Sequence, residues 1–232
     1  MEGPAKNALG DEMMTRLFDG LREAAGRPIL FLGTGDAFSA GLHLREVAAL
    51  DGEGMARFLA RLEDLMSAIF QYPAPTVACV NGHAIAGGCI IAMCCDWRVV
   101  QAGAHAKIGL NEVAIGLRFP PRILEICRRR LSVHHLGEVL LGAKLYGPEE
   151  ALRVGLVDEL AERAEDVARA HLEALASHPP QAYAATKRDL RGSSPSDLMD
   201  DATWECHMLE LFPVWTDPAV KASVTRVLSG KR

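Results

Sequence analysis

The sequence has no long apolar run and no excess of positive charge. Its longest stretch of apolar and small residues, residues 84–95, is far shorter than the ~20 residues that a membrane-spanning helix needs. There are 25 Lys and Arg against 30 Asp and Glu, which gives a net charge of −5. Binders of nucleic acid and of anionic membranes have the opposite balance, so we expect neither partner.

Signals for secretion, disulfides and metals are also lacking. Residues 1–13 have no apolar core behind a basic cluster, so no secretion signal is predicted. The six cysteines form no CxxC pair and have no metal-like spacing to histidine, and three of them lie in one apolar segment. This pattern is typical of buried free thiols in a reducing compartment. We therefore expect a cytoplasmic protein without a metal site.

The composition and the hydrophobic pattern predict an α/β fold. Of 232 residues, 49 % are hydrophobic and 24 % are charged, as in a soluble globular protein with a sizeable core. Short apolar runs predict buried strands at residues 29–32, 76–80 and 97–100. Helical spacing predicts helices at residues 11–25, 58–69, 89–95, 121–131, 133–141, 149–154 and 164–176. We expect an α/β core over residues 1–192 and a helical region over 193–232, divided at a Ser- and Pro-containing linker.

The turn that follows the first predicted strand excludes two familiar sites. Gly33 and Gly35 begin a dinucleotide-binding pattern, but Phe38 stands where the third glycine belongs. Ser39 suggests a nucleophile elbow, but that pattern needs glycine two positions earlier, where this chain has Ala37. Taken alone, the segment favours a plain tight turn.

A second glycine-rich segment, residues 81–88, ends in Gly87 and Gly88. Small residues let a helix begin close to a ligand, and the first N–H groups of a helix have no partner within it. The N–H of Gly87 is thus placed to bind a polarised carbonyl oxygen. In isolation, however, the segment favours close packing of a helix on a strand.

Glu112 lies in an apolar loop between Gly109 and Gly116. A desolvated carboxylate has a raised pKa and is a better base near neutral pH. The alternatives are a solvent-facing side chain and a salt bridge to Arg118. By contrast, the run 128–130 of three arginines predicts a solvated helix face, and the adjacent His134 and His135 are interpreted as surface or structural residues.

Taken together, several motifs resemble the crotonase superfamily, also called the enoyl-CoA hydratase/isomerase family. The resemblance runs from about residue 5 to the C-terminus, and its motifs lie at residues 7–9, 37–42, 81–89, 95–96 and 155–158. It implies a spiral core of ββα turns, C-terminal helices that make trimer contacts, and an acyl-CoA thioester as substrate without a cofactor. The family's usual first two strands are missing or lie outside this sequence.

The resemblance also assigns the candidate site residues. It places the two backbone donors of an oxyanion hole on Leu42 and Gly87, and the catalytic base on Glu112. The second glutamate of hydratases is replaced by Ile90, and a third acidic position used by some relatives is Pro120.

The remaining positions that match the family concern binding of the substrate. Ala40 and Leu44 are expected to contact the substrate together with Ile90, and Arg45 is expected near the CoA phosphates. His43 replaces the acid that is common at its position.

One base without a partner that activates water suits proton relocation better than hydration. The segments around Glu112 and Leu42 look most like those of Δ3,Δ2-enoyl-CoA isomerases. The alternatives are another acyl-CoA reaction on the same scaffold and a crotonase-like protein for binding or assembly. Residues 204–212 with Trp215 carry more apolar surface than a solvated tail needs. They predict a homotrimer, or a dimer of trimers, that buries these residues between subunits.

Overall fold

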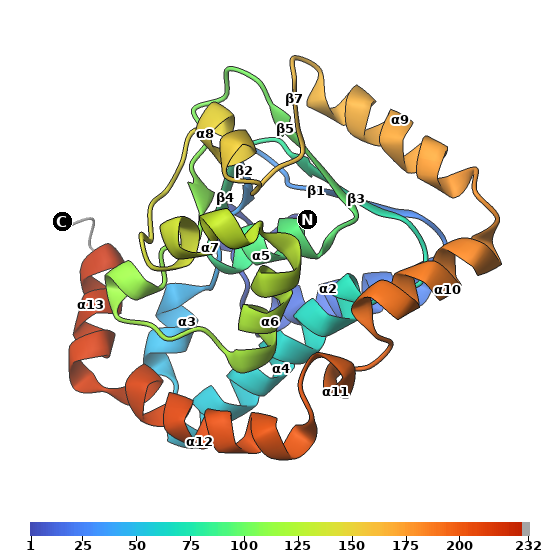
Figure 1. Ribbon diagram of the computed structural model, residues 1–232. Coiled ribbons are helices and arrows are strands. Elements are labelled where there is room, and N and C mark those ends of the chain that lie inside the picture. Colours follow the sequence, from blue (N-terminus) through green and yellow to red (C-terminus); the bar gives the residue numbers. More distant parts are fainter. Residues whose placement is uncertain (229–232) are drawn as a thin grey trace.

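The computed structural model describes residues 1–228, which form two parallel sheets surrounded by helices (Figure 1). The larger sheet has the strand order β1-β3-β5-β7, formed by Ile29–Leu32, Thr76–Val80, Trp97–Gln101 and Glu159–Ala161. The smaller sheet has the order β2-β4-β6, formed by Ala37–Ser39, His83–Ile85 and Ile108–Gly109. The three predicted strands are confirmed, and all belong to the larger sheet, although β1 is mostly half-buried and not buried as predicted.

Successive strands alternate between the two sheets, so the chain advances as a spiral. β1 and β2 precede α3 (Leu44–Ala49) and α4 (Gly52–Phe70), and β3 and β4 precede α5 (Gly87–Cys94). The third turn runs through β5 and β6 to the short helix η1 (Val113–Ile115) and α6 (Pro121–Arg130). Because every ladder is parallel, equivalent strand ends lie at the same edge and bring distant loops together.

The other helices cover the outside of the spiral. Two precede the first strand, α1 (Pro4–Asn7) and α2 (Asp11–Ala24). Those of the second half are α7 (Val133–Leu140), α8 (Pro148–Arg153), α9 (Ala164–Ala176), α10 (Pro180–Arg191) and α11 (Pro195–Leu198). The apolar face of α4 packs on α5 and α6 and is buried along most of its length. The main core therefore lies between these three central helices and the sheets.

The C-terminal region wraps around the same central helices. In Figure 1, α12 (Asp201–Thr216) runs below α4, and α13 (Pro218–Leu228) turns up beside α3. Trp215 is 3 % exposed within this single chain, and Met208 and Leu211 are buried as well. The expectation that Trp215 is free for a subunit interface is therefore wrong, since its own chain covers it. On the same helix, Leu209 is 71 % exposed.

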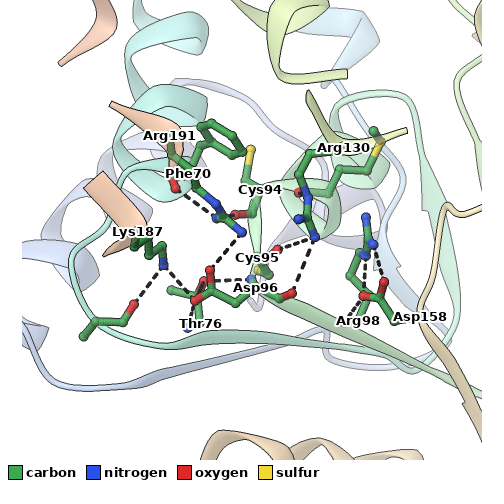
Figure 2. Close-up of polar contacts among 12 residues, drawn as sticks. Phe70, Thr76, Cys94, Cys95, Asp96, Arg98, Arg130, Asp158, Lys187 and Arg191 are labelled. Carbon is green, nitrogen blue, oxygen red and sulfur yellow. Dashed lines mark hydrogen bonds and ion pairs between the residues drawn. The ribbon is translucent and has the colours of Figure 1, made fainter. Parts of the chain in front are cut away.

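A network of charges surrounds the C-terminal end of α5 (Figure 2). The carboxylate of Asp96 forms ion pairs with the ammonium group of Lys187 at 2.7 Å and with the guanidinium of Arg191 at 2.9 Å. Arg191 also donates a hydrogen bond to the carbonyl of Cys94. Arg130 donates to the carbonyls of Met93 and Cys95. Positive charge at this end of a helix is favourable because the last carbonyls lack partners there. The prediction of a solvated arginine run is thus wrong for Arg130.

No helix within residues 1–228 is both long and apolar enough to cross a membrane. In the same range, no three His, Cys, Asp or Glu side chains are grouped closely enough to hold a metal ion. The six cysteines are free thiols, of which only Cys206 is exposed.

Candidate functional site

A cavity of about 220 Å³ lies at the N-terminal end of α5, between α3, α4, the loop before α6, and α12. Most of the predicted site residues line it, namely Ala40, Leu42, Leu44, Gly87, Ile90 and Glu112. The structure thus brings these predicted residues together from three separate segments of the chain. Arg45 is exposed on α3 and is not part of this lining.

The backbone of Leu42 is held by pairing with Leu9. Leu9 donates its N–H to the carbonyl of Gly41 at 2.7 Å and accepts the N–H of His43 at 2.9 Å. In such a parallel bridge, the N–H and C=O groups of Leu42 itself point away from Leu9. The N–H of Leu42 is therefore left for another partner.

Gly87 begins α5 beside this segment. A Cβ atom added to Gly87 would lie 3.4 Å from Cδ2 of Leu42 and 4.0 Å from Cα of Gly41. The N-cap residue Ala86 has a φ of 48° and supplies no side-chain cap, so the first N–H groups of α5 are not covered by it. Two segments with available backbone donors thus lie next to each other at the cavity.

The second glycine, Gly88, explains how the helix comes so close to β2. A Cβ atom there would lie 2.4 Å from the carbonyl oxygen of Ser39, a distance that only glycine avoids. Ser39 is itself buried, and its hydroxyl donates to the carbonyl of Asn7 at 2.8 Å. Ser39 therefore has a structural role, as the rejection of the nucleophile elbow predicted. Close packing and available backbone donors occur together here, so the two interpretations of this segment are compatible.

Glu112 lies in the wall of the cavity and is 7 % exposed. Its Oε2 atom is buried and has no hydrogen-bond partner among the described residues. Burial raises the pKa of the Glu112 carboxyl to about 7. Arg118 pairs with Glu210 on α12 at 3.2 Å. The desolvated interpretation of Glu112 is thus confirmed against the two alternatives.

The rest of the lining is almost wholly apolar. Ile90, on the first turn of α5, is 1 % exposed, and no carboxylate other than Glu112 lines the cavity within residues 1–228. The one additional polar side chain with an oxygen is the amide of Asn111. The arrangement can accept one proton at a time and provides no second acid to activate water.

Several lining residues were not predicted from the sequence. They are the apolar residues Leu62, Phe119, Ile123 and Trp215, and the amide Asn111. Asn111 directly precedes Glu112 and Phe119 follows it within the same loop segment, so their closeness in the sequence was a usable signal. Leu62 and Trp215 lie 50 or more residues from Glu112 in the chain, and no local pattern indicates that they meet it.

Charged groups next to the cavity wall join three helices. The carboxylate of Glu63 is fully buried, accepts the backbone N–H of Arg122 at 2.7 Å, and also accepts the indole N–H of Trp204. The N-cap of α6 is Pro120, which has no side-chain acceptor, so Glu63 of α4 takes the place of a cap. The guanidinium of Arg122 lies 4.7 Å from the Trp204 ring centre and pairs with Asp201. Glu63 thereby fixes α6 and α12 to α4.

Comparison with known proteins begins with the sequence. The family described as enoyl-CoA hydratase/isomerase matches residues 1–222. A putative enoyl-CoA hydratase of Thermus thermophilus is 33 % identical over 191 residues, which are 78 % of this chain and 74 % of that protein. The human mitochondrial enoyl-CoA delta isomerase 1 is 29 % identical over 206 residues, which are 85 % of this chain and 68 % of that protein.

Solved structures give a similar result. Human mitochondrial Δ3-Δ2-enoyl-CoA isomerase has a TM-score of 0.90 at 24 % identity, over 98 % of this chain and 90 % of that one. An enoyl-CoA hydratase from Bacillus halodurans has a TM-score of 0.81 at 26 % identity, over 95 % of this chain and 91 % of that one. Isomerases and hydratases thus share this fold, so the fold alone does not distinguish the two reactions.

Proposed function

The chain belongs to the enoyl-CoA hydratase/isomerase family, and from that premise we propose that it is a Δ3,Δ2-enoyl-CoA isomerase. The observation that carries the proposal is the single carboxylate of the cavity. Glu112 is buried, and its Oε2 atom has no hydrogen-bond partner among the described residues. The aliphatic Ile90 occupies the position at which the hydratases that this sequence resembles have a second glutamate. One base and no second acid suit the transfer of a proton between two carbons.

The proposed reaction begins with the thioester carbonyl. The N–H groups of Leu42 and Gly87 bind its oxygen, while Glu112 removes a proton from C2 of a 3-enoyl-CoA. The negative charge passes to the carbonyl oxygen as a dienolate, where the two donors stabilise it. One such donor typically contributes ~10²–10³ in rate. Glu112 then returns the proton to C4, which moves the double bond into conjugation with the carbonyl.

The environment of Glu112 suits this role. A base works best when its pKa lies near the operating pH, and burial raises the pKa of Glu112 to about 7. The apolar walls keep water away from the dienolate, which favours return of the proton to carbon. The substrate is a CoA thioester, no cofactor takes part, and Arg45 at the exposed start of α3 is proposed to face the CoA phosphates.

The test compares wild-type protein with Glu112→Gln, using Glu165→Gln on the surface of α9 as the matched control. Each is offered a 3-enoyl-CoA and a 2-enoyl-CoA, and exchange of C2 protons of a saturated acyl-CoA with deuterated water is followed. Isomerisation should fall by ~10²–10⁴ in Glu112→Gln, as expected for loss of a general base. Thioester binding should barely change because the oxyanion donors belong to the backbone.

Three outcomes would contradict the proposal. Rapid hydration of the 2-enoyl-CoA by wild-type protein would assign a hydratase. Full isomerase activity in Glu112→Gln would remove Glu112 as the base. Tight thioester binding by wild-type protein with no exchange above the buffer rate would indicate a protein kept for binding or assembly.

A further inference from the structure

The cavity has an open end and a closed end. Leu42, Leu44 and Ala86 are partly exposed, and Val227 of α13 is 44 % exposed, so these residues surround the mouth. Away from the mouth the lining is buried, and it includes the side chains of Leu62, Phe119, Ile123 and Trp215, each 8 % exposed or less. An acyl chain that extends inward from the oxyanion donors therefore meets a wall.

Trp215 is the largest side chain of that wall, and it comes from the C-terminal region. Its indole N–H donates to the carbonyl of Arg118 at 2.9 Å, in the loop that carries Phe119 and Pro120. The ring is 3 % exposed, and this hydrogen bond fixes its orientation. An indole with its N–H satisfied by the chain presents only apolar surface to a ligand.

The wall is also held from behind. Glu63, next to Leu62 on α4, accepts both the N–H of Arg122 at the start of α6 and the indole N–H of Trp204 on α12. The three helices that carry Leu62, Ile123 and Trp215 are thus joined through one buried carboxylate. A close-packed protein interior has low compressibility, so we expect the side chains of the wall to stay in place when a ligand enters.

We propose that Trp215 ends the acyl pocket and limits the enzyme to thioesters of short acyl chains. The inference rests on the proposed function for the direction in which the acyl chain enters. Away from its mouth, the cavity of about 220 Å³ is bounded by side chains that are 8 % exposed or less, so a long acyl tail could extend past the wall only if the Trp215 ring moved.

The experiment measures binding, so it does not depend on turnover. Saturated acyl-CoA thioesters from butanoyl to hexadecanoyl are titrated into wild-type protein, Trp215→Ala and Trp215→Phe by calorimetry. Trp97→Ala is the matched control, since Trp97 lies on β5 outside the cavity and stacks on His171 at 4.8 Å. Each methylene that enters an apolar pocket should raise the affinity by about fourfold until the pocket is full.

For wild-type protein, the affinity should stop rising before dodecanoyl-CoA. Trp215→Ala should move that limit to longer chains, whereas Trp215→Phe and Trp97→Ala should leave it in place. Thermal melts identify any variant that is unfolded, and Trp215→Leu then replaces Trp215→Ala. A wild-type affinity that rises through hexadecanoyl, or a limit that is unmoved in folded Trp215→Ala or Trp215→Leu, would overturn the proposal. A shifted limit without isomerisation of any 3-enoyl-CoA would sink the proposed function and leave the role of Trp215 intact.

Discussion

Replacing Asp96 with asparagine should strongly destabilise the protein. The carboxylate of Asp96 lies 2.7 Å from Nζ of Lys187 and 2.9 Å from Arg191, and it accepts the backbone N–H of Thr76 at 2.8 Å. The three charged side chains are between 6 % and 11 % exposed. Breaking a buried ion pair by removing one partner costs ~3–5 kcal/mol because the remaining charge is left uncompensated. At ~2–4 °C per kcal/mol for a chain of this length, the Tm should fall by ~6–20 °C.

The matched control is Asp36→Asn, which breaks an ion pair of similar length at the surface. Lys6 and Asp36 lie 2.6 Å apart, but their side chains are 51 % and 70 % exposed. Exposed pairs contribute little, so the Tm of this variant should stay close to the wild-type value. Equal Tm values for the two asparagine variants, measured by calorimetry at neutral pH, would refute this account of the cluster.

The stabilisation by Asp96 should also depend on pH, which a comparison of wild-type protein with Asp96→Asn tests. Burial alone would raise the pKa of Asp96, but the charges of Lys187 and Arg191 outweigh it and hold that pKa below its ordinary value. A carboxyl with a depressed folded-state pKa stabilises the fold above its unfolded pKa of ~3.9 and loses that contribution as the pH falls further. The gap in stability between wild-type protein and Asp96→Asn should therefore narrow below about pH 4. A gap that stays constant down to the acid transition would contradict the assignment.

Three further predictions concern the activity and the assembly. Burial raises the pKa of Glu112 to about 7, and since only the carboxylate accepts a proton, kcat/KM for a 3-enoyl-CoA should fall as the pH drops through that value. A flat profile from pH 5 to 9 would exclude Glu112 as the base. Ile90→Glu should add a trace of hydration activity on a 2-enoyl-CoA. It should also lower the Tm, because it places a charge in an apolar wall. An unchanged Tm would mean that the side chain at position 90 is accessible to water. Light scattering should give the mass of a trimer or hexamer, with exposed Leu209 and Leu141 as candidate contacts, whereas a monomeric mass at micromolar concentration would count against it.

The strands of the larger sheet could be predicted because each is a local run of mainly apolar residues that can be recognised without knowledge of the rest of the fold. Residues 29–32 and 76–80 are mainly apolar runs of four and five residues that are bounded by breakers; the second is fully buried, and the first is half-buried apart from the buried Phe31. The strands of the smaller sheet have only two or three residues, which is too short for any periodicity to register. The crotonase-like spiral itself was implied by motifs, and the likeness to solved structures confirms it.

The candidate site was predictable where a residue's role depends on its near neighbours. Glu112 stands out as an acid among apolar residues, and Gly87 as the start of a helix too uniform to lie at the surface. Trp215 could not be placed in this way, since the apolar residues of α12 are not gathered on one face and so do not show which of them is buried, or against what. The burial of Arg130 could not be predicted either. Three consecutive arginines are indistinguishable in the sequence, and only the fold places the C-terminal end of α5 against Arg130.

The joint between α4 and α12 has a consequence for the order of folding. Glu63 and Trp204 are 141 residues apart in the chain, and Trp215 is 97 residues from its partner Arg118. Contacts so distant in sequence form slowly, and a chain emerging from the ribosome has the spiral well before it has α12. Until Trp215 arrives, the cavity lacks one of its buried walls and Glu112 is less shielded from water. Chains in which α12 has not yet docked should therefore be less reactive than the fully folded protein.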